Sequence, residues 1–131
     1  MISVVREQLI ASAAQARERA YAKYSNFTVG AAVQTASGEV FTGCNVENAS
    51  YGLTICAERV ALCSAVAGGF QKLTAIAIVT SGGMPPCGAC RQCMAEFNND
   101  IIVLMVDADD LTQVKEQRLS ELLPSSFKLT N

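Results

Sequence analysis

Three cysteines and one glutamate have the types and spacing to do chemistry together. Cys56 and Glu58 are two residues apart at the start of an apolar segment, and Cys87 and Cys90 form a Cys-x-x-Cys pair directly after Pro86. Side chains three residues apart at a helix start lie on one face, so this pair can hold one metal ion. If the two helix starts lie side by side, Cys56 adds a third thiolate. The fourth tetrahedral position then stays open, as is typical of catalytic zinc.

The residues beside the thiols indicate how such a metal would be used. Glu58 can reach a water molecule at the open position and move its protons. Three thiolates outweigh the charge of Zn²⁺, which raises the pKa of bound water, so we expect a positive group nearby. Arg59 beside Glu58 and Arg91 beside Cys90 are the candidates, because a guanidinium can donate hydrogen bonds to thiolate sulfur.

Composition limits both the chemistry and the partners. The chain has 131 residues, of which 50% are hydrophobic, so we expect one domain over residues 1–131. It contains no histidine, which removes Ser-His and Cys-His nucleophiles and histidine metal ligands. Ten basic against 12 acidic residues predict no general attraction to nucleic acid or to a membrane surface. Charges interrupt the apolar residues of the N-terminal segment, so we expect no signal peptide or membrane span, and reduced thiols in the cytoplasm.

The spacing of apolar residues predicts the elements that must position these groups. We expect helices over residues 3–22, 55–69 and 88–97. We expect strands over residues 27–36, 39–46, 73–80 and 101–107, the first two joined as an antiparallel hairpin. Residues 111–117 fit an edge strand or a helix start, and residues 119–124 fit one helical turn stopped by Pro124. This alternation predicts a sheet covered by helices on both faces, with a site beyond the carboxyl ends of its strands.

Four stretches of the sequence carry a resemblance to a known family. They are YSNFTVGAAV (24–33), GCNVENASYGLTICAERVA (43–61), MPPCGACRQ (84–92) and LLPSSF (122–127). The second and third contain a Cys₃ version of the zinc deaminase signature, Cys-x-Glu followed by Pro-Cys-x-x-Cys. Over nearly its whole length the chain resembles the small, zinc-dependent cytidine deaminases that act on free nucleosides. The resemblance implies a three-layer α/β/α fold with a mixed five-stranded sheet that begins with an antiparallel hairpin.

The resemblance also implies a role for each matching residue. The metal ligands of one Zn²⁺ per chain are Cys56, Cys87 and Cys90. Glu58 is implied as the proton shuttle. The substrate contacts implied are Asn45 and Glu47 on the ribose, Phe27 on the pyrimidine, the Ala57 backbone on its edge, and Tyr51 and Phe127. The last two are implied to come from neighbouring subunits, because the family is typically a homotetramer.

The function that follows is pyrimidine salvage. The resemblance implies hydrolytic deamination of free cytidine and 2′-deoxycytidine to uridine and 2′-deoxyuridine plus ammonia, by zinc-activated water. A carboxylate at Glu47 suits a sugar hydroxyl and would repel a phosphate, which favours free nucleosides over nucleotides. The alternatives are a deaminase of a cytosine-bearing nucleoside antibiotic and a non-catalytic Cys₄ zinc module. The Cys₄ module would take its fourth ligand from Cys44, Cys63 or Cys93, and it gives Glu58 no role.

Overall fold

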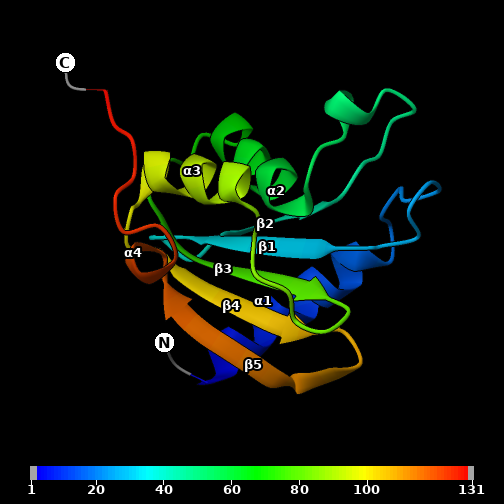
Figure 1. Ribbon diagram of the computed structural model, residues 1–131. Coiled ribbons are helices and arrows are strands. Elements are labelled where there is room, and N and C mark those ends of the chain that lie inside the picture. Colours follow the sequence, from blue (N-terminus) through cyan, green and yellow to red (C-terminus); the bar gives the residue numbers. More distant parts are fainter. Residues whose placement is uncertain (1–2, 130–131) are drawn as a thin grey trace.

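A mixed five-stranded sheet forms the middle of the protein (Figure 1). The computed structural model describes residues 3–129. The sheet has the order β2-β1-β3-β4-β5 and consists of β1 (Gly30–Thr35), β2 (Val40–Cys44), β3 (Leu73–Thr80), β4 (Ile102–Asp107) and β5 (Asp110–Arg118). β1 is antiparallel to β2 and β3, β4 is parallel to β3, and β5 is antiparallel to β4. The carboxyl ends of β2, β3 and β4 therefore lie at the same edge of the sheet.

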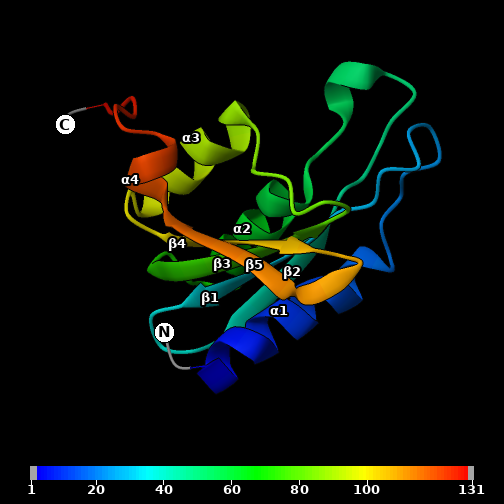
Figure 2. The same ribbon diagram turned by 60° about the horizontal axis from the view of Figure 1, so that its bottom comes forward.

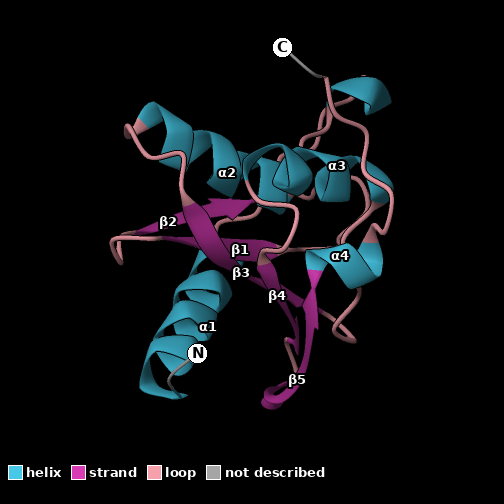
Figure 3. Cartoon of the chain, turned by 90° about the vertical axis from the view of Figure 1, so that its left-hand side faces the viewer, coloured by secondary structure: helices cyan, strands magenta, loops and turns pink. Residues whose placement is uncertain are grey.

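Helices cover both faces of this sheet. They are α1 (Ser3–Arg17), α2 (Ala57–Ala67), α3 (Gly88–Phe97) and the short α4 (Leu119–Leu122). Figure 3 shows α2 and α3 on one face and α1 on the other, and Figure 2 brings α1 to the front. The predicted three-layer α/β/α architecture, with an antiparallel first hairpin, is confirmed. Among residues 3–129, no helix combines the length and apolar character needed to cross a membrane.

The central strand β3 separates two apolar cores. Ile76 and Ile78 belong to the core under α2 and α3, whereas Ala75 and Ala77 belong to the core under α1. This alternation follows from the period of two along a strand, which sends successive side chains to opposite faces. Because both faces of β3 are covered, its sequence is an almost continuous apolar run rather than an alternating pattern.

Most predicted elements are confirmed, and the first helix is the main correction. It ends at Arg17 rather than at residue 22. The following residues form tight turns, and the Tyr21 backbone then pairs with Val46 in the segment after β2. Helical spacing of apolar residues could not reveal this, because a long-range contact replaces the last helical turns. The ambiguous residues 111–117 lie in β5, an edge strand, and one helical turn before Pro124 is confirmed.

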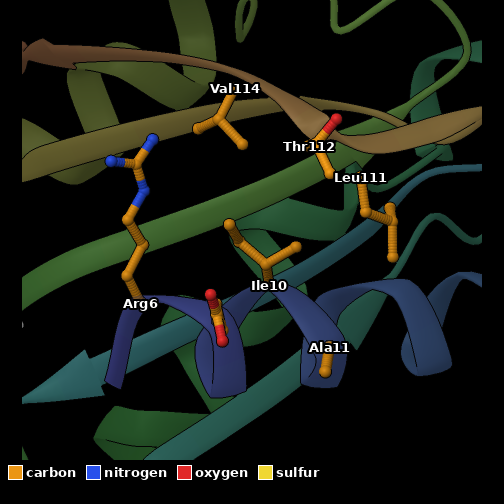
Figure 4. A pocket seen from close by; sticks show the side chains of 7 residues that line it. Arg6, Ile10, Ala11, Leu111, Thr112 and Val114 are labelled. Carbon is orange, nitrogen blue, oxygen red and sulfur yellow. The ribbon is translucent and has the colours of Figure 1, made fainter. Parts of the chain in front are cut away.

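A hollow of about 450 Å³ lies between α1 and β5, on the face away from α2 and α3 (Figure 4). Ile10 and Leu111 line it, and Arg6 lies at its side. Arg6 pairs with Glu116 of β5 at 3.5 Å across the same face. Cys56, Cys87 and Cys90 are not among its lining residues, so it is separate from the predicted site.

Candidate metal centre

The three predicted thiols come together at the edge of the sheet where β2, β3 and β4 end. Cys56 is the N-cap of α2 and Cys87 is the N-cap of α3, both in extended backbone, and Cys90 lies in the first turn of α3. Their sulfur atoms all lie within 4.8 Å of one another, and those of Cys87 and Cys90 are 3.5 Å apart. Tetrahedral zinc with bonds of about 2.3 Å places thiolates about 3.8 Å apart. The cluster therefore fits a single zinc ion.

Charge in the cluster also fits a metal. The hydrogen bond from Cys90 and the nearby Arg59 guanidinium lower the pKa of Cys56 to about 5. The same hydrogen bond, together with burial, raises the pKa of Cys90. Without a cation, Cys56 is therefore ionised while Cys90 keeps its proton. A bound divalent cation compensates the charge and lets the remaining thiols ionise, and thiolates are the ligands that zinc favours over calcium or magnesium.

Arg59 lies where the sequence predicted a compensating charge. Its Nη2 atom donates to the Cys56 sulfur at 3.7 Å. Its Nε atom is buried and has no hydrogen-bond partner among the described residues. Arg91, the other candidate, is placed differently: its guanidinium donates to the carbonyl oxygens of Pro86 and Leu122, each at 2.8 Å. Arg91 thus braces the loop that leads into Cys87 rather than a sulfur atom.

Glu58 is buried beside the thiols. Its side chain is 5% exposed, and this burial raises the pKa of its carboxyl, with the Cys56 charge raising it further. A raised pKa brings the protonated and ionised forms closer in free energy at neutral pH, which suits a group that must both accept and donate a proton. Glu58 lines a cavity of about 220 Å³ together with Cys56, Cys87, Asn45 and Phe27.

A second, outer cavity of about 680 Å³ continues from the first one. The two share Phe27, Thr54 and Cys56 among their lining residues. Ala57 lines the inner cavity, and Glu47 lines the outer one. The arrangement offers a small compartment at the thiols for a ring and a wider compartment outside it for a polar substituent.

Asn45 and Glu47 hold the loop that carries Phe27. The Asn45 side-chain oxygen accepts from the Val29 N–H at 2.9 Å, and its amide nitrogen donates to the Phe27 carbonyl oxygen at 2.8 Å. The Glu47 carboxylate accepts from the backbone N–H groups of Tyr24 and Ser25 and from the Ser25 hydroxyl. An amide and a carboxylate can each form further hydrogen bonds, so both retain capacity toward a ligand.

The two predicted partner-site aromatics differ in position. Tyr51 lies in the 3₁₀ turn Tyr51–Leu53, is 91% exposed and lines the outer cavity of its own chain. Phe127 is 69% exposed and lines neither cavity of its own chain. The Gln92 side chain of α3 donates to the Phe127 carbonyl oxygen at 2.9 Å and thereby fixes the C-terminal segment on this helix.

Sequence reasoning missed several residues that line the inner cavity. Ile78 and Thr80 come from the end of β3, where an apolar run gives no sign of a binding role. Met84 and Pro85 line it from the loop that follows, and their place in the stretch 84–92 could have signalled this. Ser25, which donates to Glu47, was likewise inside the stretch 24–33 but has an ordinary loop residue type.

A three-thiolate metal centre between two helix starts, on a mixed α/β/α sheet, defines a class of zinc-dependent hydrolases in which a neighbouring carboxylate moves protons. The family model for the cytidine and deoxycytidylate deaminase zinc-binding region matches residues 4–106, and the chain belongs to this family. The metal that the centre is built to bind is therefore zinc.

The sequences of several relatives match this chain over almost its whole length. A cytidine deaminase of Halalkalibacterium halodurans is 48% identical over 127 residues, which are 93% of this chain and 93% of the relative. A cytidine deaminase of Sporosarcina psychrophila is 44% identical over 92% of this chain and 90% of its own length. The crystal structure of cytidine deaminase from Burkholderia pseudomallei has a TM-score of 0.88 and 48% identity, with 97% of this chain and 100% of that chain covered.

Proposed function

We propose that this protein hydrolyses free cytidine and 2′-deoxycytidine to uridine and 2′-deoxyuridine with release of ammonia. The observation that carries the proposal is the buried carboxyl of Glu58 in the same small cavity as Cys56 and Cys87. That cavity joins a proton-transfer group to a metal centre, which is the combination that hydrolytic deamination of a pyrimidine requires. Cytidine deaminases among the relatives support this choice of substrate.

One zinc ion per chain would be held by Cys56, Cys87 and Cys90, and when bound it supplies a Lewis acid that makes water acidic enough to act as a nucleophile. Glu58 accepts a proton from the attacking water and delivers it to N3 of the pyrimidine, while the water oxygen bonds to C4. Glu58, again a carboxylate, then accepts the remaining proton from the hydroxyl at C4 and passes it to the exocyclic amino group. The C4–N bond breaks, ammonia leaves, and the carbonyl of uridine remains.

The lining residues supply substrate contacts in this proposal. Phe27 packs on the pyrimidine ring, and the Ala57 backbone hydrogen-bonds its edge. Asn45 and Glu47 hydrogen-bond the ribose hydroxyl with the capacity that their loop contacts leave free. Glu47 also disfavours nucleotides, because its carboxylate would repel a phosphate, and the Ser25 hydroxyl lowers the pKa of this carboxyl and so favours its charged form.

The proposal also covers the oligomeric state of the protein and its location in the cell. We infer a homotetramer of single-domain chains (residues 1–131) in the cytoplasm, in which Tyr51 and Phe127 extend the active sites of neighbouring subunits. The exposure of both aromatic side chains supports this role, and Phe127 lines neither cavity of its own chain. Analytical ultracentrifugation tests the assembly, and monomeric protein with full activity would contradict shared sites.

The same structure weighs against a purely structural zinc module. Among residues 3–129, the group of side chains placed to hold a metal contains Cys56, Cys87 and Cys90 and leaves out the three candidates for a fourth ligand, Cys44, Cys63 and Cys93. A three-ligand centre keeps a position open for water. An antibiotic nucleoside with a cytosine base would use the same inner cavity, so it belongs in the substrate panel.

The decisive experiment is an ultraviolet assay of cytidine conversion to uridine, with zinc quantified per chain. We expect activity in the native protein and a loss of at least about 10² to 10⁴-fold in kcat for Glu58→Gln, which removes the proton shuttle and keeps the shape. Glu18→Gln, an exposed change after α1, is the matched control and should remain active. Near-normal turnover by zinc-loaded Glu58→Gln would exclude the assigned role. Full zinc without activity on cytidine, deoxycytidine or cytosine-bearing antibiotics would exclude the proposed function.

A further inference from the structure

Gly43 is the point at which β2 touches the backbone of α2. A Cβ atom at Gly43 would lie 2.5 Å from the Ala61 nitrogen and 2.6 Å from the Ala57 carbonyl oxygen. Both are helix backbone atoms, which cannot rotate aside as the end of a side chain can. The φ angle of Gly43 lies outside the left-handed region, so this position requires glycine for space and not for backbone conformation.

On α2, the residues in this contact lie at the start of the helix, beside Cys56 and Glu58. Ala57 stands between Cys56 and Glu58 in the sequence, and the carbonyl that approaches Gly43 belongs to the peptide linking Ala57 to Glu58. Ala57 and Ala61 are both 0% exposed and belong to the core between α2 and the sheet. The height of this turn above β2 therefore sets where the thiol of Cys56 and the carboxyl of Glu58 lie.

The other two thiols depend on different contacts. The buried residues of α3 are Cys90, Met94 and Ala95, and no atom of α3 is among the three nearest that a methyl at Gly43 would meet. α3 packs beside α2 in the same core, but a methyl at Gly43 would press on α2 alone, so α3 is displaced only indirectly and by a smaller amount. The separation between Cys56 and the α3 thiols then changes, although each helix remains folded.

The displacement can be sized from the structure. Moving the nearest contact of a methyl at Gly43 from 2.5 Å to an ordinary 3.4 Å requires a shift of about 0.9 Å between helix and strand. Metal–ligand distances in a functional site hold to within about 0.2 Å. A misplacement of about 1 Å at reacting groups costs on the order of 100-fold in rate. The expected shift is thus large for the metal centre and small for the fold.

We propose that Gly43 is a positioning residue that sets the first turn of α2, and with it Cys56 and Glu58, at the correct distance from the α3 thiols. The activity part of this inference rests on the proposed deaminase function, whereas the zinc part rests only on the metal centre.

The test compares zinc-loaded Gly43→Ala with Gly68→Ala. Gly68 lies at the other end of α2, where a Cβ atom would meet the side-chain ring of Phe41 at 2.7 Å, and the nearest helix backbone atom, the Ser64 carbonyl oxygen, at 3.3 Å. For Gly43→Ala we expect the zinc dissociation constant, measured by competition with a chromophoric chelator, to rise at least about tenfold. We expect kcat for cytidine to fall on the order of 100-fold with a much smaller change in KM, and the absorption spectrum of the Co²⁺-loaded protein to shift. Gly68→Ala should match the native protein in all three.

Two outcomes overturn the inference: Gly43→Ala with native zinc affinity, kcat and Co²⁺ spectrum, or equal losses in both glycine variants. If Gly43→Ala does not fold, Ala61→Ser and Ala65→Ser replace the pair, since both alanines are fully buried on α2 and differ in distance from Cys56. A larger loss of zinc affinity in Ala61→Ser supports the inference, and equal affinities refute it. If the native protein binds zinc but leaves cytidine unchanged, the proposed function fails while the zinc comparison still tests Gly43.

Discussion

Replacing Asn45 with alanine should damage both stability and substrate binding. The side chain is 7% exposed and joins two backbone groups of the loop before β1, the Val29 N–H and the Phe27 carbonyl. Asn45→Ala removes both partners without filling their place. Because the Phe27 ring lines the inner and outer cavities, loosening this loop also disturbs the substrate site.

The loss of stability can be calculated from the two backbone groups that lose their hydrogen-bond partner, the Val29 N–H and the Phe27 carbonyl. A buried donor or acceptor without a partner costs about 1 to 3 kcal/mol, and the Phe27 carbonyl is only partly buried, so the total should be about 2 to 4 kcal/mol. With a urea dependence of about 2 kcal/mol per molar, the unfolding midpoint should fall by about 1 to 2 M. In the proposed function Asn45 also hydrogen-bonds the sugar, and loss of that hydrogen bond should raise KM for cytidine about tenfold.

Urea unfolding at fixed protein and zinc concentrations measures the first effect, and steady-state kinetics measures the second. Asn99→Ala is the control, because Asn99 is exposed in the turn before β4. Asn45→Asp tests the direction of a pH dependence of stability. This variant keeps the acceptor for the Val29 N–H but puts a carboxylate against the Phe27 carbonyl. The folded-state pKa of that carboxyl should lie above its unfolded value of about 3.9, so the stability deficit should grow as pH rises from about 4 to 7. A midpoint for Asn45→Ala within about 0.2 M of the control would refute this reasoning.

Two further predictions concern ionised groups at the site. In zinc-free protein at about pH 6, iodoacetamide should modify Cys56 before the exposed Cys63, because the pKa of Cys56 lies at about 5. Peptide mass spectrometry measures the labelling of each cysteine, and equal labelling of the two would contradict this prediction. Ser25→Ala should raise the pKa of Glu47 toward its ordinary value, since the Ser25 hydroxyl is the main cause of its lowering. As pH falls, the Glu47 carboxyl should therefore take up its proton at a higher pH in the variant than in the native protein, and an unchanged ¹³C NMR titration of Glu47 would contradict this.

The helix starts and strand runs that carry the chemistry could be predicted because their signals are local. Cys87 follows a loop rich in glycine and proline, and α3 begins at Gly88 as expected. β3 coincides with the apolar run 73–80, since a strand covered on both faces needs no alternation. The end of the first helix was mispredicted because the pairing of Tyr21 with Val46 depends on residues distant in the sequence.

The sequence by itself determined the chemistry of this protein: three thiols, one carboxylate and two candidate guanidinium groups at spacings that suit zinc and proton transfer. Only the tertiary structure decided how each group is used. It brings Cys56 to the α3 thiols across the carboxyl ends of β2 and β3, and it turns Arg91 away from the sulfur atoms toward backbone carbonyls. Residue types and spacing fix which reactions are available, because they fix charge, ligand type and helix phase. Distances between elements depend on long-range packing, such as the contact of α2 with Gly43, which no local pattern contains.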